Sequence, residues 1–260
     1  MDFASRSMLL ATALFLGMLV AMELGRRHGQ HRMRRDPEGI RVGTGAIEGA
    51  VFGLLGLVLA FTFSGAASRF DARRQLVAQE ANAIGTAWLR LGVLPPDDQS
   101  ALRELFRRHL DARIATYTDL EAGRLSEVEQ DLQASAALQQ QIWNAAQNSC
   151  TRDGRPFVCP LVLPAVNEML DITTTRTAAA RSHVPPIVFV LLVVSALLGA
   201  ALAGHATSGG RERPWFHALA FAAMTSLTVL VIYDLEYPRK GLIRIDATDQ
   251  VLVELRKSFD

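Results

Sequence analysis

Four apolar runs separated by charged segments organise this chain. The runs extend over residues 7–24, 49–67, 187–203 and 216–233. Each is close to the roughly 17–25 residues that an α-helix needs to cross the hydrocarbon core of a bilayer, and none carries a charge at its centre. Four buried helices of a soluble protein would instead contain polar residues at helical spacing within each run. The pattern therefore predicts a membrane protein with four transmembrane helices.

The long polar stretch between the second and third runs is also helical in pattern. Apolar residues recur at helical spacing from Leu102 to Leu120 and from Val128 to Ile142, and no alternating strand pattern interrupts them. We therefore expect an all-α integral membrane protein with a helical-bundle insert between spans 2 and 3.

Turn and capping residues predict where the helices of the insert begin and end. Pro95 and Pro96 should stop the long helix that enters the insert, and Gly123 should end the next helix. Ser126 with Glu129 three residues later predicts a capping box at the start of the helix after that.

The expected organisation has four parts. They are a transmembrane hairpin at 1–68 with spans of about 7–24 and 46–68, the extramembrane insert at 69–183, a second hairpin at 184–236 with spans of about 187–206 and 215–234, and a C-terminal tail at 237–260.

The second apolar run carries small or apolar residues at alternating spacings of four and three, which keeps them on one face of a helix. We call this face the seam; its first half is Gly49, Gly53, Gly56, Ala60, Phe63, Ala67 and Phe70. Its second half lies among charged residues and is Val77, Ala81, Ile84, Trp88 and Leu91. Because one continuous helical face lies first in an apolar run and then among charged residues, the sequence predicts a single helix, from about residue 46 to 92, that crosses the bilayer and continues into water.

The seam has two interpretations. Its glycines could let another span of the same chain pack closely, as small residues do in membranes. Alternatively, copies of this helix surround an axis, and Phe63 and Phe70 form hydrophobic constrictions of a pore. The charges at the mouths of that pore would be Glu48 at one end and Arg69, Arg73 and Arg74 at the other.

Charged residues next to the spans also have a structural interpretation. Each mouth charge fits an anchor at the membrane interface equally well. On the last helix of the insert, Arg176 and Arg181 are expected to pair with Asp71 or Glu80.

Arginines in the two short loops predict the orientation. The loop residues are Arg26, Arg27, Arg32, Arg34, Arg35 and Arg41, followed by Arg211 and Arg213. Short basic loops stay cytoplasmic, so the basic loop at 25–45 should be cytoplasmic and the insert periplasmic or extracellular. Arginines also flank the membrane on the other side, which dilutes this rule.

The only two cysteines, Cys150 and Cys159, bracket a ten-residue stretch. A turn at Asp153-Gly154 could bring their sulfur atoms together, and a disulfide would place the insert in an oxidising compartment. A metal site and two free thiols are the alternatives. Two cysteines with no histidine nearby make a poor zinc site.

Motifs for chemistry are missing from the sequence. It contains no HExxH, P-loop, GxSxG or CxxC motif, and its six histidines are isolated. The formal net charge is +1, and the basic residues cluster beside the membrane rather than on one soluble face. We therefore expect no enzyme activity, no cofactor, no metal and no nucleic-acid partner.

Several local strings resemble the bacterial bestrophin-like membrane proteins over nearly the whole chain. The strings are Glu48–Phe61, Glu80–Gly85, Leu163–Glu168 with Arg176, and Asp234–Gly241. The resemblance implies a multi-pass protein of the bacterial inner membrane that forms homo-oligomers. Bestrophins are anion channels whose second span lines the pore with bulky apolar residues, a role that falls to Phe63 and Phe70 here. It also implies a cytosolic insert, opposite to the charge and cysteine arguments.

Two functions follow. The first is an oligomeric ion channel, with inorganic ions as the passing species and span 2 lining the pore. The second is a membrane scaffold or sensor that does not transport and whose helical insert binds a partner or ligand. A secondary transporter is less favoured, because the sequence has no inverted repeat.

Overall fold

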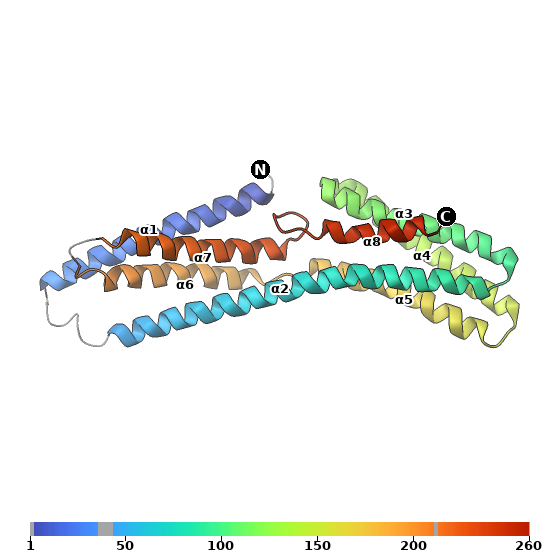
Figure 1. The fold of residues 1–260 in the computed structure, drawn as a ribbon, viewed down its shortest axis with the longest axis horizontal. Helices are drawn as coiled ribbons and strands as arrows, with labels where there is room; N and C mark the ends of the chain where they lie inside the picture. The colour runs from blue at the N-terminus through green and yellow to red at the C-terminus, as the bar shows by residue number, and fades with distance from the viewer. Residues whose placement is uncertain (1–2, 36–43, 211–212, 260) are drawn as a thin grey trace. The chain divides into compact units, whose positions relative to one another are not determined.

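The structure is a computed structural model that describes residues 3–35, 44–210 and 213–259. Arg41 and Arg211 of the basic loops lie outside these ranges. The helices are α1 (Phe3–Arg35), α2 (Thr44–Arg90), the short 3₁₀ helix η2 (Leu91–Val93), α3 (Pro96–Ala122), α4 (Leu125–Asp153), α5 (Val158–Arg181), α6 (Pro186–Ala206), α7 (Trp215–Glu236) and α8 (Asp246–Lys257) (Figure 1). No strand occurs in the described ranges, so the expected all-α class is confirmed.

The chain divides into two compact units. The first consists of Met1–Phe70 with His183–Ile243, and the second consists of Asp71–Ser182 with Arg244–Asp260. The helix α2 contributes residues to both units without a break.

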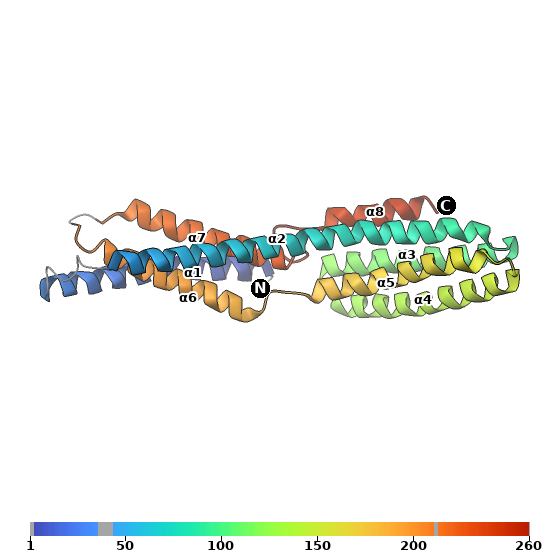
Figure 2. The same ribbon diagram turned by 90° about the horizontal axis from the view of Figure 1, so that it is seen from below.

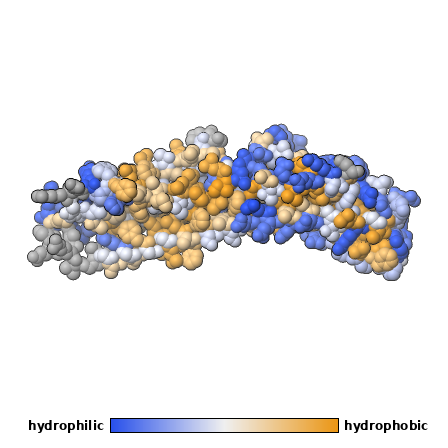
Figure 3. Space-filling model, in the orientation of Figure 1, coloured by the Kyte–Doolittle hydropathy of each residue, from blue (hydrophilic) through white to orange (hydrophobic). Residues whose placement is uncertain are grey.

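Four helical stretches in the described part of the chain are long and apolar enough to cross a membrane. They are Phe3–Arg35, Gly45–Val93, Val158–Ala206 and Trp215–Glu236. Each contains one of the four apolar runs, so the expectation of four candidate membrane-spanning helices is confirmed. Figure 3 shows apolar residues over much of the visible face of the first unit, while polar residues are frequent on the second.

In the first unit, α1 packs along both α6 and α7 (Figure 1). Two glycines allow the backbones of α1 and α6 to touch. A Cβ atom on Gly25 would overlap the carbonyl oxygen of Ala201, and one on Gly204 would overlap that of Met22. Met18 is fully buried in the apolar cluster between these helices. This is the close packing through small residues that membrane helices use.

The membrane-length part of α2 joins the first unit through side chains. Leu55 and Phe52 fill the space beside Gly199 of α6, and the Phe52 ring meets the Phe221 ring of α7 edge-on with centroids 5.9 Å apart. Ala66 is buried in a smaller cluster with the end of α7. One face of α2 is thereby covered, and it is not the face that carries the seam glycines.

The second unit is a helical bundle with its own core. Helix α4 packs against α3 and α5, and α8 packs against α3 (Figure 2). The fully buried side chains of this core come from all five helices of the unit; they include Ile84, Phe106, Ile142, Val162 and Leu252. Such a core lets the second unit fold around its own apolar side chains rather than around lipid.

Helix boundaries follow the proline and glycine signals but not the capping box. Helix α2 ends at Arg90, η2 follows, and α3 begins at Pro96; Gly123, with φ of 74°, ends α3. Helix α4 begins at Leu125 after Arg124, without a side-chain cap. The predicted capping box at Ser126 is therefore wrong. The backbone N–H of Arg124 bonds the Asp119 carbonyl at 2.9 Å, and the turn out of α3 leads into α4 with Arg124 as the N-cap residue, two residues before Ser126.

Candidate functional site

The second half of the seam is the core face of α2 and of the first residue of η2 in the second unit. Val77, Ile84 and Leu91 are fully buried, and Ala81 is nearly so. The Trp88 ring stacks on the ring of Phe259, near the C-terminus, with centroids 3.9 Å apart. The 3.5-residue spacing here has an ordinary cause, since this face packs inside the bundle.

From Gly49 to Phe63, the first half of the seam has no such neighbours. A Cβ atom on Gly49, Gly53 or Gly56 would meet nothing within 4 Å. Ala60 is exposed, and the Phe63 side chain is 43% exposed. The interpretation in which these glycines pack against another span of the same chain is therefore not realised in the described structure. This part of the seam faces whatever surrounds the chain.

The last two members of the first half lie at the edge of an apolar cluster. Ala67 and Phe70 are partly buried and pack beside Ala66 and Ile232. The open part of the seam therefore extends from Gly49 to Phe63.

The four charged residues expected at pore mouths all lie near polar groups of the described structure. Glu48 lies 3.8 Å from His205, and Arg69 donates from Nε to Glu236 at 2.9 Å. Arg73 is buried and donates to the carbonyls of residues 179 and 182. Arg74 lies 3.8 Å from the Asp71 carboxylate, and the Arg74 side chain is half exposed.

Two buried carboxylates at the end of α7 organise the polar contacts of the first unit. Glu236 accepts hydrogen bonds from Arg69 and from the backbone N–H of Val184 at 3.2 Å. Asp234 accepts from two backbone N–H groups of the loop after α7, at 2.9 and 2.6 Å. Gly241 allows this approach, because a Cβ atom there would overlap the Asp234 carboxylate. Neither carboxylate has a role predicted from the sequence, although two acids at the end of an apolar run are an available signal.

A buried ion-pair network lies inside the second unit. Glu80 is fully buried, and its Oε1 atom accepts from Arg113 Nε at 2.6 Å. Arg176 binds the Oε2 atom and also lies 3.4 Å from Asp249. The Tyr117 hydroxyl donates to Glu80 at 3.3 Å, and the Arg176 guanidinium sits 4.1 Å from the Tyr117 ring centroid. The expected Arg176–Glu80 pair is present, and Arg113 is an additional partner that sequence reasoning missed.

The network fixes the charge states of its neighbours. Burial alone would raise the pKa of Glu80, but the two guanidinium groups outweigh it and hold that pKa below its ordinary value. Burial, helped by the positive charge of Arg113, lowers the pKa of His109 to about 4. His109 is therefore neutral at pH 7, while Glu80 is ionised.

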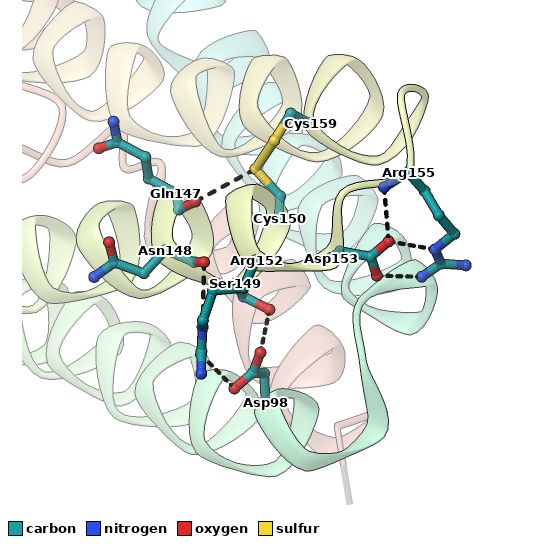
Figure 4. Close-up of a disulfide and its surroundings, with 9 residues drawn as sticks. All are labelled: Asp98, Gln147, Asn148, Ser149, Cys150, Arg152, Asp153, Arg155 and Cys159. Atoms are coloured by element: carbon teal, nitrogen blue, oxygen red, sulfur yellow. Dashed lines mark hydrogen bonds and ion pairs between the residues drawn. A yellow bond between two sulfur atoms is a disulfide. The ribbon is translucent and has the colours of Figure 1, made fainter.

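Cys150 and Cys159 are joined by a disulfide with a Cα–Cα distance of 5.1 Å (Figure 4). The bridge links the end of α4 to the start of α5. Beside it, Asp98 accepts hydrogen bonds from Ser149 at 2.6 Å and from Arg152 at 2.8 Å, which ties the first turn of α3 to α4. No group of three His, Cys, Asp or Glu side chains in the described ranges is arranged to hold a metal ion.

The described residues form an all-helical fold with four candidate membrane-spanning helices, and the second of these presents an uncovered small-residue face. The chain matches the family model of the bestrophin-like domain over residues 8–249. It therefore belongs to the bestrophin-like family.

Solved structures agree with this fold. A crystal structure of a bacterial bestrophin homolog from Klebsiella pneumoniae, carrying a single substitution, is 14% identical with a TM-score of 0.69 and covers 98% of this chain and 97% of that chain. Another crystal structure of the Klebsiella homolog, also 14% identical, has a TM-score of 0.62 over 96% of this chain and 98% of that one. A crystal structure described only as a membrane protein is 15% identical, with a TM-score of 0.60 over 97% and 99%. The comparison with curated proteins found no match to the chain.

Proposed function

We propose that the chain is a subunit of an oligomeric ion channel, in which the seam from Gly49 to Phe63 surrounds a pore along the symmetry axis. Family membership supports the class of protein. The observation that carries the proposal is the uncovered state of Gly49, Gly53 and Gly56.

The chemistry of the seam favours other copies of the chain over lipid as its surroundings. A lipid-facing helix surface gains from large aliphatic side chains, and α2 has them elsewhere, at the exposed Leu54 and Leu57. Glycines at spacings of four and three give a shallow groove that fits a second helix or an axial opening. The second half of the same seam is already occupied by the bundle.

Phe63 is the side chain that would narrow the pore. It is 43% exposed and lies on the seam, with glycines and alanine on the turns before it. A ring of phenylalanines around an axis forms a hydrophobic constriction, which can close to ions by dewetting. Glu48 would lie near one mouth, where a ring of carboxylates influences which ions enter.

We further propose a bacterial inner-membrane location with the basic loop at 25–45 in the cytoplasm and the insert at 69–183 in the periplasm. The short basic loops support this orientation, and so does the disulfide between Cys150 and Cys159, since such bonds persist in oxidising compartments.

The test is ion flux from liposomes that contain the purified full chain, together with its mass in nanodiscs. The proposal expects a mass of several subunits and a measurable flux. It also expects Phe63→Ala to change the flux at least severalfold, because a smaller side chain widens the constriction.

Phe61→Ala is the matched control. Phe61 is 70% exposed on the same helix, and it lies on roughly the opposite side from Phe63, since successive helical residues are about 100° apart. Its replacement should leave the flux unchanged. A monomer, or an oligomer without flux in which both variants are silent, would contradict the channel and favour the scaffold or sensor.

A further inference from the structure

A pocket of about 480 Å³ opens in the first unit, where the apolar run of α1 and the helix α6 end and α7 begins. We call it the loop-side pocket. Its apolar lining includes Leu19, Met22, Phe52 and Phe221, which come from three helices. The volume lies within the roughly 300–1,000 Å³ that is usual for sites of small ligands.

The polar lining of the loop-side pocket is positively charged. Arg26, Arg27 and Arg213 contribute to it together with a single carboxylate, Glu23. Glu23 accepts a hydrogen bond from Arg27 at 2.8 Å and lies 3.4 Å from Arg213. Three guanidinium groups against one carboxylate leave a net positive charge.

Two of these arginines keep much of their surface open. The Arg27 side chain is 71% exposed and that of Arg213 is 51% exposed. The Arg26 side chain is buried and donates to the Gly210 carbonyl at 3.0 Å, so it adds positive charge to the lining but offers no exposed contact. Arg27 and Arg213 are thus the groups that can reach an anion at the pocket.

We propose that the loop-side pocket binds an anionic phospholipid, with the phosphate on the exposed sides of Arg27 and Arg213 that face away from Glu23 and the upper acyl chain on the apolar lining. The site is separate from the seam and does not depend on ion conduction. The lining residues come from the ends of the spans next to the basic loops, the side that the proposed orientation places in the cytoplasm. Basic pockets between transmembrane helices on that side suit anionic headgroups.

The position of Trp215 supports a lipid over a soluble anion. Trp215 lines the pocket at the first position of α7 and is half exposed, as expected for a tryptophan in the interfacial layer. The Arg213 guanidinium lies 5.7 Å from the Trp215 ring centroid. A free phosphate would use the arginines but would leave the apolar lining and this ring without a partner.

Trp215 also provides the readout, because bromine atoms on a lipid acyl chain quench tryptophan fluorescence on contact. The full chain is placed in bilayers that mix phosphatidylglycerol with phosphatidylcholine, with one lipid brominated at a time. The variant Trp215→Phe gives the background from the other two tryptophans, Trp88 and Trp143, which belong to the second unit.

Brominated phosphatidylglycerol should quench Trp215 with a preference of more than tenfold over brominated phosphatidylcholine. Arg27→Gln and Arg213→Gln should each lower that preference about fivefold, the equivalent of about 1 kcal/mol per charge near the membrane surface. Arg32→Gln is the matched control, since Arg32 is an exposed arginine of α1 that does not line the pocket. It should leave the preference unchanged.

Four results would overturn the proposal. Equal quenching by the two lipids would show that the headgroup charge is not recognised. Equal effects of Arg27→Gln and Arg32→Gln would assign the preference to the general surface charge. Loss of the preference in millimolar inorganic phosphate at constant ionic strength would identify a soluble-anion site. Quenching no greater than in Trp215→Phe would show that no acyl chain enters the pocket.

Discussion

Replacing Glu80 with glutamine is expected to lower the free energy of unfolding of the second unit by about 3–5 kcal/mol, the usual effect of breaking a buried ion pair. Glu80 is fully buried between Arg113 and Arg176. Glutamine keeps the shape and can accept a hydrogen bond, but it removes the negative charge. Asp249 compensates Arg176 only in part, at 3.4 Å, so a buried positive charge is left over.

The measurement is the thermal midpoint of the purified chain in detergent, followed by circular dichroism. With about 2–4 °C per kcal/mol for a chain of this size, Glu80→Gln should lower the midpoint by roughly 6–20 °C. Glu104→Gln is the control: Glu104 lies 3.6 Å from Arg107 but is 61% exposed, and an exposed pair contributes less than about 1 kcal/mol. Equal midpoints for Glu80→Gln and the unmodified chain would refute the claim that this network holds the bundle together.

Three further predictions concern other parts of the chain. His109 has a pKa of about 4 in the folded chain against 6.5 as its ordinary value, so the unfolded state binds the proton more tightly and the free energy of unfolding falls as the pH is lowered from 6.5 to about 4. His109→Gln should remove that loss, which is about 3 kcal/mol at most. A pH profile of the thermal midpoint that His109→Gln leaves unchanged would contradict this prediction. Gly204→Ala should destabilise the first unit by about 1–3 kcal/mol, because the new Cβ atom overlaps the α1 backbone. Gly45→Ala should not destabilise it, since a Cβ atom there meets nothing within 4 Å. Similar thermal midpoints for the two variants would refute the close approach of the α1 and α6 backbones. Replacing both Cys150 and Cys159 by alanine should lower the free energy of unfolding by roughly 2–3 kcal/mol, because the disulfide closes a short loop. Reductant should then lower the thermal midpoint of the unmodified chain only. An equal effect of reductant on the double variant would exclude the disulfide as the cause.

The sequence predicted the helices well because their signals are local. The apolar runs marked the candidate spans, Pro96 marked the start of α3, and Gly123 marked its end. The capping box at Ser126 failed, because the backbone contact of the preceding turn with the end of α3 decides where α4 begins. Local chemistry alone does not contain that contact.

The polar networks were predicted only in part. The Arg176–Glu80 ion pair was predicted, because the two opposite charges lie at a similar level along two helices that are expected to be neighbours. Arg113 is one of several arginines on α3, and only the packing of that helix selects it. Asp234 and Glu236 depend on a loop that folds back on the end of α7, which no helical periodicity describes.

The spacing of the seam could not separate its two halves. From Val77 to Leu91 the pattern is the core of a bundle, while from Gly49 to Phe63 the same pattern is uncovered. A spacing of four and three says that a face is packed, but not whether the partner is in the same chain. That distinction is what the channel proposal rests on.

Conductance of a Phe63→Cys variant tests the proposal most directly. The only two cysteines of the chain are joined in a disulfide, so the introduced thiol is the single reactive one. If the seam surrounds a pore, a charged, water-soluble thiol reagent should block the current of Phe63→Cys channels in planar bilayers and leave Phe61→Cys channels unaffected. Unchanged current in Phe63→Cys, equal block of both variants, or no current from the unmodified chain would contradict the account.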